Sequence, residues 1–302
     1  MNASDFAFVA GLLKDRSGLI ITPDKLYLLE ARLTPIARKH GLDNIDRLAE
    51  ALRKSAPPVM ADEVVDAMTT NETMFFRDRT PFDQLKKTLI PALIEQRSAS
   101  RSLRIWSAAC STGQEPYSLA MMLRDDFPAL AAWKIEIVST DISPTVLDRA
   151  RSGLYSTFEV QRGLPIHMLI KHFDQVGEQW EIKPELRRMV DFRQANLLHD
   201  ISGLGSFDII LCRNVLIYFD QPTKTKILNA ISRRLLPHGT LVLGGAESIF
   251  GLSDTLETQP GLRGVYRRVA GQKTEVTAAR ETAETGTLGQ RSAIMARARA
   301  AS

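Results

Sequence analysis

Between residues 103 and 243, short apolar runs alternate with segments of helical periodicity, and this alternation limits the fold more than any other feature of the chain. The expected strands are 103–108, 134–140, 189–193, 207–212 and 240–243. Helices that begin near Gln114, Ser143 and Gln221 separate most of them. Such alternation predicts an α/β domain with a doubly wound, mainly parallel sheet, in which the five strands take the order 3-2-1-4-5.

The segments on either side of this region have different patterns. Residues 1–70 contain four short amphipathic stretches, which predict a small helical bundle. Residues 71–102 are expected to form a linker and a connecting helix. The rhythm breaks between 153 and 186, where a hairpin around 179–182 is expected. Residues 271–302 have almost no apolar periodicity, so we expect a disordered tail.

Composition excludes several classes of protein. Lys and Arg (39) and Asp and Glu (35) are interspersed, and no basic run of the kind expected for a nucleic-acid binder occurs. Cys110 and Cys212 have no zinc-site spacing, so neither a metal nor a disulfide framework is expected. The N-terminus does not resemble a signal peptide, and no apolar run approaches the roughly 20 residues of a membrane span. A cytoplasmic monomer without membrane insertion is the expectation.

Polar residues follow the predicted strands where a ligand would bind in an open sheet. The first strand runs into a turn of small residues, 109–118, with a single glycine, which does not fit the dinucleotide fingerprint of an NAD enzyme. Such a turn can also be a plain tight connection. Asp141 ends the second strand and can accept the ribose hydroxyls of an adenosine-containing ligand, or act as a helix N-cap. Arg213 and Asn214 follow the fourth strand and are expected to contact ligand, whereas Tyr218 fits packing equally well.

The linker carries an unusual mixture of side chains in residues 69–78, where polar groups stand beside Phe75 and Phe76. One interpretation is a segment folded over a ligand. The alternative is that the two phenylalanines fasten the domains together while the polar groups face water.

Four strings, taken together, resemble the CheR family of chemotaxis receptor glutamate methyltransferases. They are Asn71–Arg77, Ala108–Ser118, Thr140–Ser143 and Cys212–Phe219. The likeness runs in order from about residue 5 to 269. It implies a helical N-terminal domain and a class I, Rossmann-like methyltransferase domain over 103–270, with an antiparallel β-subdomain inserted at about 155–190.

The resemblance also implies S-adenosylmethionine as cofactor and chemoreceptor cytoplasmic domains as partners. Arg77 and Tyr218 would be the catalytic residues, with Tyr218 near the transferred methyl group. The residues implied to bind the cofactor are Asn71, Thr73, Arg77, Glu115, Asp141, Asn196, Leu197, Arg213 and Asn214.

The implied chemistry agrees with this set. A glutamate side chain has a reference pKa near 4.3, so at neutral pH it is already an anionic nucleophile and needs no general base. The protein has to align the reacting atoms and exclude water. Two rivals remain: a methyltransferase of this fold that acts on another protein or a nucleic acid, and a regulatory module without turnover.

Two departures from the family pattern bear on docking and on the site. Residues 244–248 read Gly-Gly-Ala-Glu-Ser where many relatives have Gly-His-Ser-Glu, so no role is assigned to this turn. The expected hairpin turn, 174–178, is shorter than in relatives that bind a receptor's C-terminal peptide. We therefore expect docking without that peptide, through the N-terminal helices. Arg32, Arg38 and Lys39 would face acidic receptor segments, or equally belong to the solvated surface.

Overall fold

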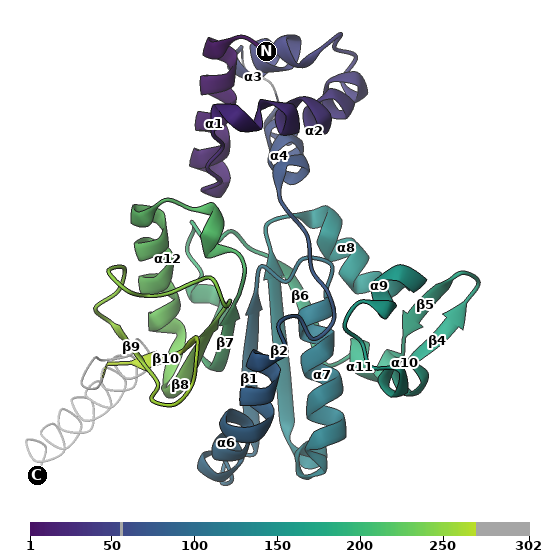
Figure 1. Ribbon diagram of the computed structural model, residues 1–302, viewed down its shortest axis with the longest axis vertical. Coiled ribbons are helices and arrows are strands. Elements are labelled where there is room, and N and C mark those ends of the chain that lie inside the picture. Colours follow the sequence, from purple (N-terminus) through teal and green to yellow (C-terminus); the bar gives the residue numbers. More distant parts are fainter. Residues whose placement is uncertain (55–56, 270–302) are drawn as a thin grey trace, which may run out of the picture.

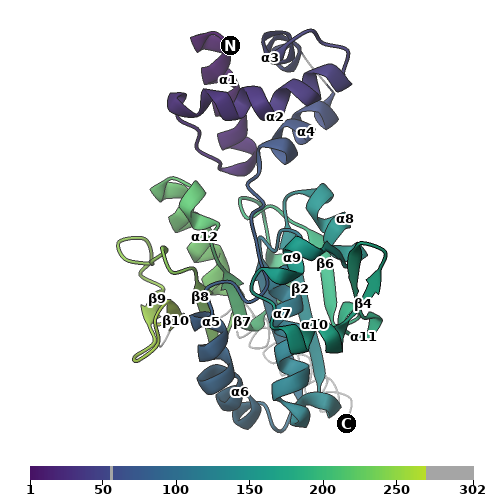
Figure 2. The same cartoon turned by 45° about the vertical axis from the view of Figure 1, so that its right-hand side comes forward.

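The computed structural model describes residues 1–54 and 57–269, so the tail expected at 271–302 lies outside the described residues. A helical bundle stands over one end of an α/β domain, and a smaller subdomain lies beside that domain (Figures 1 and 2). Within the described part of the chain, no helix is long and apolar enough to cross a membrane.

Four helices and one 3₁₀ turn form the bundle, as predicted. They are α1 (Ala3–Ser17), the turn Pro23–Lys25, α2 (Leu26–Lys39), α3 (Ile45–Arg53) and α4 (Pro58–Met68). Asn2 and Asn44 cap α1 and α3 by accepting backbone N–H bonds with their side chains. The apolar stripes meet in a core of their own, in which Leu13, Leu29 and Leu33 are fully buried.

A seven-stranded sheet is the centre of the α/β domain, in the order β6-β2-β1-β7-β8-β10-β9. Its strands are β1 (Ser102–Ala108), β2 (Lys134–Asp141), β6 (Val190–Gln194), β7 (Phe207–Cys212), β8 (Leu235–Leu243), β9 (Leu256–Thr258) and β10 (Val265–Arg268). The first five pair in parallel in the predicted order. The antiparallel strands β9 and β10 were not predicted.

Both faces of the sheet are covered, so its central strands are apolar on both sides. Ile105 belongs to one core and its neighbour Trp106 to the other, because successive side chains point to opposite faces. The helices of the domain are α5 (Thr80–Gln84) and α6 (Ile90–Gln96), joined by a π-helical turn at Leu85–Leu89, then α7 (Gln114–Asp126), α8 (Pro144–Ser152) and α12 (Gln221–Arg234). Short 3₁₀ turns lie at Pro128–Ala132, Ser202–Leu204 and Leu216–Tyr218.

The inserted subdomain is the antiparallel sheet β3-β5-β4, as expected. Its elements are β3 (Leu154–Ser156), α9 (Thr157–Gln161), α10 (Ile166–His172), β4 (Phe173–Val176), β5 (Gln179–Ile182) and α11 (Pro184–Arg187). The predicted hairpin corresponds to β4 and β5, which are joined by a two-residue turn with Gly177 at φ 60°.

The linker between bundle and sheet crosses the carboxyl ends of the strands (Figure 1). Phe75 is fully buried and packs edge-on against Tyr155 and Phe173 of the inserted subdomain. Phe76 packs against Phe82 of α5. Both phenylalanines pack against the α/β domain and its inserted subdomain, and neither joins the core of the helical bundle. They fasten the linker and not the two domains, and the polar residues beside them line a cavity, which favours the interpretation of a segment folded over a ligand.

Candidate active site

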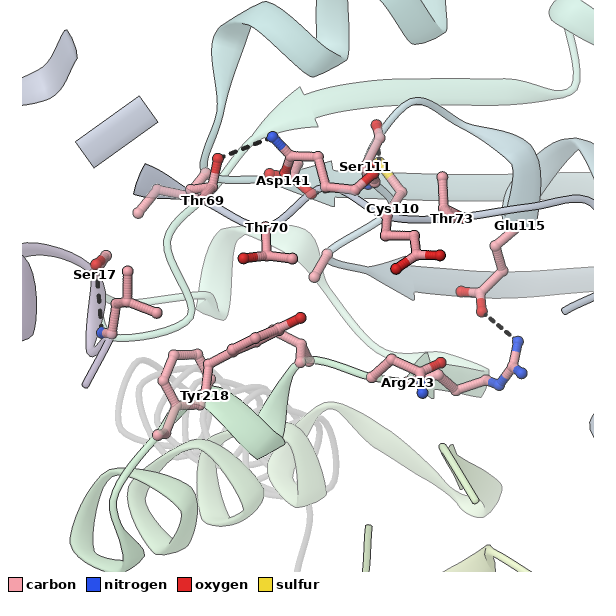
Figure 3. Close-up of a pocket in the computed structure, with 18 of the residues that line it drawn as sticks. Ser17, Thr69, Thr70, Thr73, Cys110, Ser111, Glu115, Asp141, Arg213 and Tyr218 are labelled. Carbon is pink, nitrogen blue, oxygen red and sulfur yellow. Dashed lines mark hydrogen bonds and ion pairs between the residues drawn. The ribbon is translucent and has the colours of Figure 1, made fainter. Parts of the chain in front are cut away.

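A cavity with about 840 Å³ of open space lies where the linker, the bundle and the strand ends meet. Figure 3 shows Tyr218 and Arg213 on one side, with Asp141, Ser111 and Cys110 opposite. The predicted residues that line it are Asn71, Thr73, Arg77, Glu115, Asp141, Arg213, Asn214 and Tyr218. Asn196 and Leu197 line a smaller cavity that shares Asp141 and Ile142 with the first. The first cavity therefore collects residues from five separate parts of the sequence, within 17–19, 69–77, 109–115, 141–142 and 213–219.

Asp141, at the end of β2, is 6% exposed and is held from one side by backbone donors. Its Oδ2 accepts the N–H of Ser111 at 2.8 Å, and its Oδ1 accepts the N–H of Ser143 at 3.0 Å. Burial raises the pKa of Asp141, although these backbone bonds oppose the shift. A carboxylate offers about four acceptor positions, so capacity for two further donors remains. The N-cap of α8 is Ser143, so Asp141 does not serve as that cap.

The turns after β1 and β7 adopt left-handed backbone conformations at residues other than glycine. Ala109, Ser111 and Asn214 have φ values of 57°, 51° and 58°. Such conformations cost of order 1 kcal/mol each, and they concentrate at functional sites where the surrounding structure enforces them. All three residues line the cavity.

Arg213 joins the sheet to the linker. Its side chain is 1% exposed, and its Nη1 lies 2.8 Å from Glu115 Oε2. Its Nη2 donates to the carbonyl oxygen of Arg77 at 2.6 Å and to Asp78 Oδ2 at 2.9 Å. Glu115 Oε1 accepts the hydroxyl of Ser107 at 2.7 Å. Both oxygens of Glu115 are thus engaged by protein groups, which fix the shape of this corner of the cavity.

Arg77 and Tyr218 reach the cavity from different elements. Arg77 Nη1 donates to the carbonyl oxygen of Glu72 at 2.8 Å, and Asp78 pairs with Arg213. The backbone of Tyr218 is tied to the bundle, since its carbonyl oxygen accepts the N–H of Ile20 at 3.1 Å. The side chain of Tyr218 lies in the cavity wall and is not part of the buried core.

Asn196 connects the smaller cavity to the bundle. Its Nδ2 donates to the carbonyl oxygen of Arg16 at 2.6 Å, and its Oδ1 accepts the N–H of Leu198 at 2.9 Å. The Asn196 side chain is therefore engaged by backbone groups on both ends. Leu197 presents an apolar side chain to the same cavity.

Glu247, to whose turn the sequence assigned no role, holds the loop that follows β7. Its Oε2 accepts the N–H groups of Asn214 and Gly244, both at 2.8 Å. Its Oε1 accepts those of Val215 at 2.9 Å and Leu216 at 2.7 Å. Gly244 and Glu247 fill the first and last places of the family's Gly-His-Ser-Glu pattern, and that spacing was the available signal.

The bundle contributes Ser17 and Leu19 to the cavity, which sequence reasoning missed because nothing local marks them. The docking residues stay predictions. Arg32 Nη1 donates to the carbonyl oxygens of Met68 and Thr69, at 2.9 and 2.8 Å, so one nitrogen of its guanidinium is engaged within the protein. Lys39 pairs with Glu63, and the expectation for Arg38 stays a prediction.

Cys110 lines the cavity, whereas Cys212 is fully buried in the core and does not. Burial raises the pKa of both thiols well above the ordinary range, so they are not poised as nucleophiles. Across residues 1–54 and 57–269, no three His, Cys, Asp or Glu side chains are grouped so as to hold a metal ion.

The cavity fits an adenosine-containing cofactor. Asp141 retains acceptor capacity for ribose hydroxyls, and Ile142 and Leu197 provide apolar surface beside it. Polar groups for an amino-acid moiety come from Asn71 and Thr73 of the linker.

Comparison with known proteins agrees with this geometry. Residues 4–69 match the family model "CheR methyltransferase, all-alpha domain", and residues 71–265 match "CheR methyltransferase, SAM binding domain". The chain is 40% identical to chemotaxis protein methyltransferase Cher2 of Pseudomonas putida, over 85% of this chain and 96% of that protein. It is also 40% identical to chemotaxis protein methyltransferase 1 of Pseudomonas aeruginosa, over 87% of this chain and 97% of the relative. The chain therefore belongs to the CheR family of S-adenosylmethionine-dependent chemotaxis methyltransferases.

Proposed function

We propose that the protein transfers a methyl group from S-adenosylmethionine to glutamate side chains in the cytoplasmic domains of chemoreceptors. The products are glutamate methyl esters and S-adenosylhomocysteine. The observation that carries this proposal is that Arg77 and Tyr218 line the same cavity as the buried carboxylate of Asp141. The bound cofactor supplies an electrophilic methyl group.

The proposed roles follow from the walls of the cavity. Asp141 would accept the ribose hydroxyls, and Asn196 and Leu197 would lie at the adenine. Asn71, Thr73, Glu115, Arg213 and Asn214 would surround the remainder of the cofactor. Arg77 and Tyr218 would be the catalytic residues.

The work of the protein in this reaction is alignment. No histidine is among the described residues that line the cavity, and a carboxylate nucleophile needs no general base. The planar guanidinium of Arg77 can hold the attacking carboxylate in one orientation. Binding it too strongly would stabilise the ground state, so orientation must count for more than charge pairing.

The proposal includes the organisation of the chain. We propose a helical domain at 1–70, a linker and connecting helix at 71–102, the methyltransferase domain at 103–270 and a dispensable tail at 271–302. We also propose that the protein acts in the cytoplasm as a monomer.

The test is methylation of purified receptor cytoplasmic fragments with labelled cofactor. Base-labile label on the fragment, lost when its glutamates are replaced by alanine, is the expected result. Base-stable label, or label on nucleic acid, would favour a methyltransferase of the same fold with another substrate. Cofactor binding without label on any substrate would favour a regulatory module.

A further inference from the structure

One ion pair at the edge of the cavity has no part in the roles proposed so far. Arg162 follows α9 of the inserted subdomain, and its Nη2 lies 3.0 Å from Oε1 of Glu72 in the linker. Glu72 lines the cavity. Because Arg77 donates to the carbonyl oxygen of the same Glu72, two guanidinium groups flank one acidic residue at the entrance.

The linker does not need this ion pair to stay attached to the subdomain. Phe75 packs against Tyr155 and Phe173 at ring-centroid distances of 5.1 and 5.7 Å. The backbone beside Arg162 is fixed too, since a Cβ at Gly163 would lie 2.1 Å from the carbonyl oxygen of Phe75. Buried aromatic packing and close backbone contact thus hold the two segments together beneath the ion pair.

The ion pair itself is exposed. The side chains of Arg162 and Glu72 are 37% and 67% accessible to solvent. Pairs of this kind contribute about 0–1 kcal/mol, because water and salt screen the charges. A carboxylate from another molecule can therefore replace that of Glu72 at little cost.

The inserted subdomain that carries Arg162 exposes aromatic and aliphatic side chains. Its guanidinium lies 5.5 Å from the ring centroid of Phe158, which is 68% exposed. Ile166 and Ile170, four residues apart on α10, are 68% and 69% exposed. Arginine and aromatic side chains are enriched where proteins bind each other. Two views place α9 next to the linker (Figures 1 and 2).

We propose that Arg162 is a substrate-reading residue that binds an acidic side chain of the receptor segment carrying the methylated glutamate. Phe158, Ile166 and Ile170 contact apolar side chains of that segment. Glu72 holds the place of the incoming carboxylate and competes with it. This inference rests on the proposed function, because it needs a substrate with negatively charged residues near the target.

The two partners of the ion pair give opposite expectations, and this makes the test sharp. Arg162→Ala should raise the KM for a receptor fragment about tenfold by removing a charged contact. Glu72→Gln should lower that KM roughly two- to threefold, because a competing carboxylate is lost. The affinity for S-adenosylmethionine should stay within about twofold in both. If the ion pair only stabilised the position of the linker, both variants would raise the KM for the receptor fragment.

Arg149→Ala is the matched control. Arg149 is an exposed arginine whose Nη2 lies 2.7 Å from both carboxylate oxygens of Glu159 in α9. Its replacement by alanine should leave the KM for the receptor fragment unchanged. Arg162→Lys, which keeps the charge, should recover part of the loss. If the wild-type protein forms no methyl ester on the fragment, the proposed function fails first. If it does, an unchanged KM for Arg162→Ala, or equal directions for the two variants, overturns this inference alone.

Discussion

The two walls of the cavity are built in different ways. On the sheet side, Asp141, Glu115 and Arg213 are largely buried, and each makes at least two hydrogen bonds. On the linker side, residues 69–79 are mostly half-exposed apart from the buried Phe75, and their polar contacts are mainly to backbone groups, such as the 2.8 Å bond from the Ser111 hydroxyl to the carbonyl oxygen of Asn71.

The difference separates two tasks. Burial makes every unsatisfied polar group costly, so the sheet wall is preorganised before a ligand arrives. The linker wall, in contrast, is mostly half-exposed, and it brings Arg77 to the cavity. We infer that the sheet wall supplies most of the cofactor contacts and that Arg77, on the linker wall, aligns the nucleophile.

The largest expected effect comes from the linker wall. Arg77→Ala should reduce single-turnover rate by about 100-fold or more with little change in cofactor affinity, as expected for lost positioning. Arg79→Ala, an exposed arginine two residues away, should stay within about twofold. A large loss of affinity that saturating cofactor repairs would move Arg77 to the cofactor side. Normal affinity and rate would remove it from the site.

On the sheet wall, Asp141→Asn should weaken binding of S-adenosylmethionine by roughly 10- to 150-fold, since charge-assisted hydrogen bonds contribute about 1.5–3 kcal/mol. Calorimetry measures this directly. Asp148→Asn, on the exposed side of α8, is the control and should bind normally. Unchanged affinity for Asp141→Asn would show that the ribose is held elsewhere.

Glu247→Gln tests whether the loop after β7 depends on one carboxylate. The amide keeps one acceptor oxygen for four N–H groups, so the free energy of unfolding should fall by about 2 kcal/mol. Turnover should fall roughly tenfold, because a displaced loop would also displace Asn214 and Tyr218 from the cavity wall. Denaturant unfolding and rate measurements check both. Glu257→Gln, at an exposed ion pair with Arg267, should change neither.

Acid should weaken cofactor binding through Asp141. Its folded pKa is raised above 3.8, and the charged form is the better acceptor, so affinity is complete above the raised pKa and is lost as pH falls through it. The effect on the ligand-free protein has the opposite sign, because a raised carboxyl pKa favours folding at low pH and the advantage is lost as pH rises through the folded pKa. Titration of S-adenosylhomocysteine binding against pH, with a flat profile for Asp141→Asn, checks the assignment.

The smallest effect is expected outside both walls. Deletion of residues 271–302 should leave methyl transfer within about twofold, less than roughly 0.4 kcal/mol, since the sequence there has almost no apolar periodicity. A tenfold loss would mean that this segment contributes to the site.

The sequence by itself determined the architecture, because periodicity is a local property. The short apolar runs of strands such as 207–212 and the apolar stripe of α2 are properties of neighbouring residues. Strand order followed, since connections in such sheets obey general rules. The sequence also placed Asp141 and Arg213 at strand ends, where ligands bind in open sheets. The sequence did not predict strands β9 and β10, because they are short and lie outside the alternation of strands and helices.

Only the tertiary structure decided which groups complete the cavity. Ser17 and Leu19 belong to another core and enter the site because the bundle stands over the sheet. Glu247 acts on a loop more than 30 residues earlier in the chain. Arg32, which the sequence offered as a docking residue, also donates to the carbonyl oxygen of Met68, the last residue of α4. Each of these contacts joins groups far apart in sequence, and such pairings are fixed by packing and burial, not by local pattern.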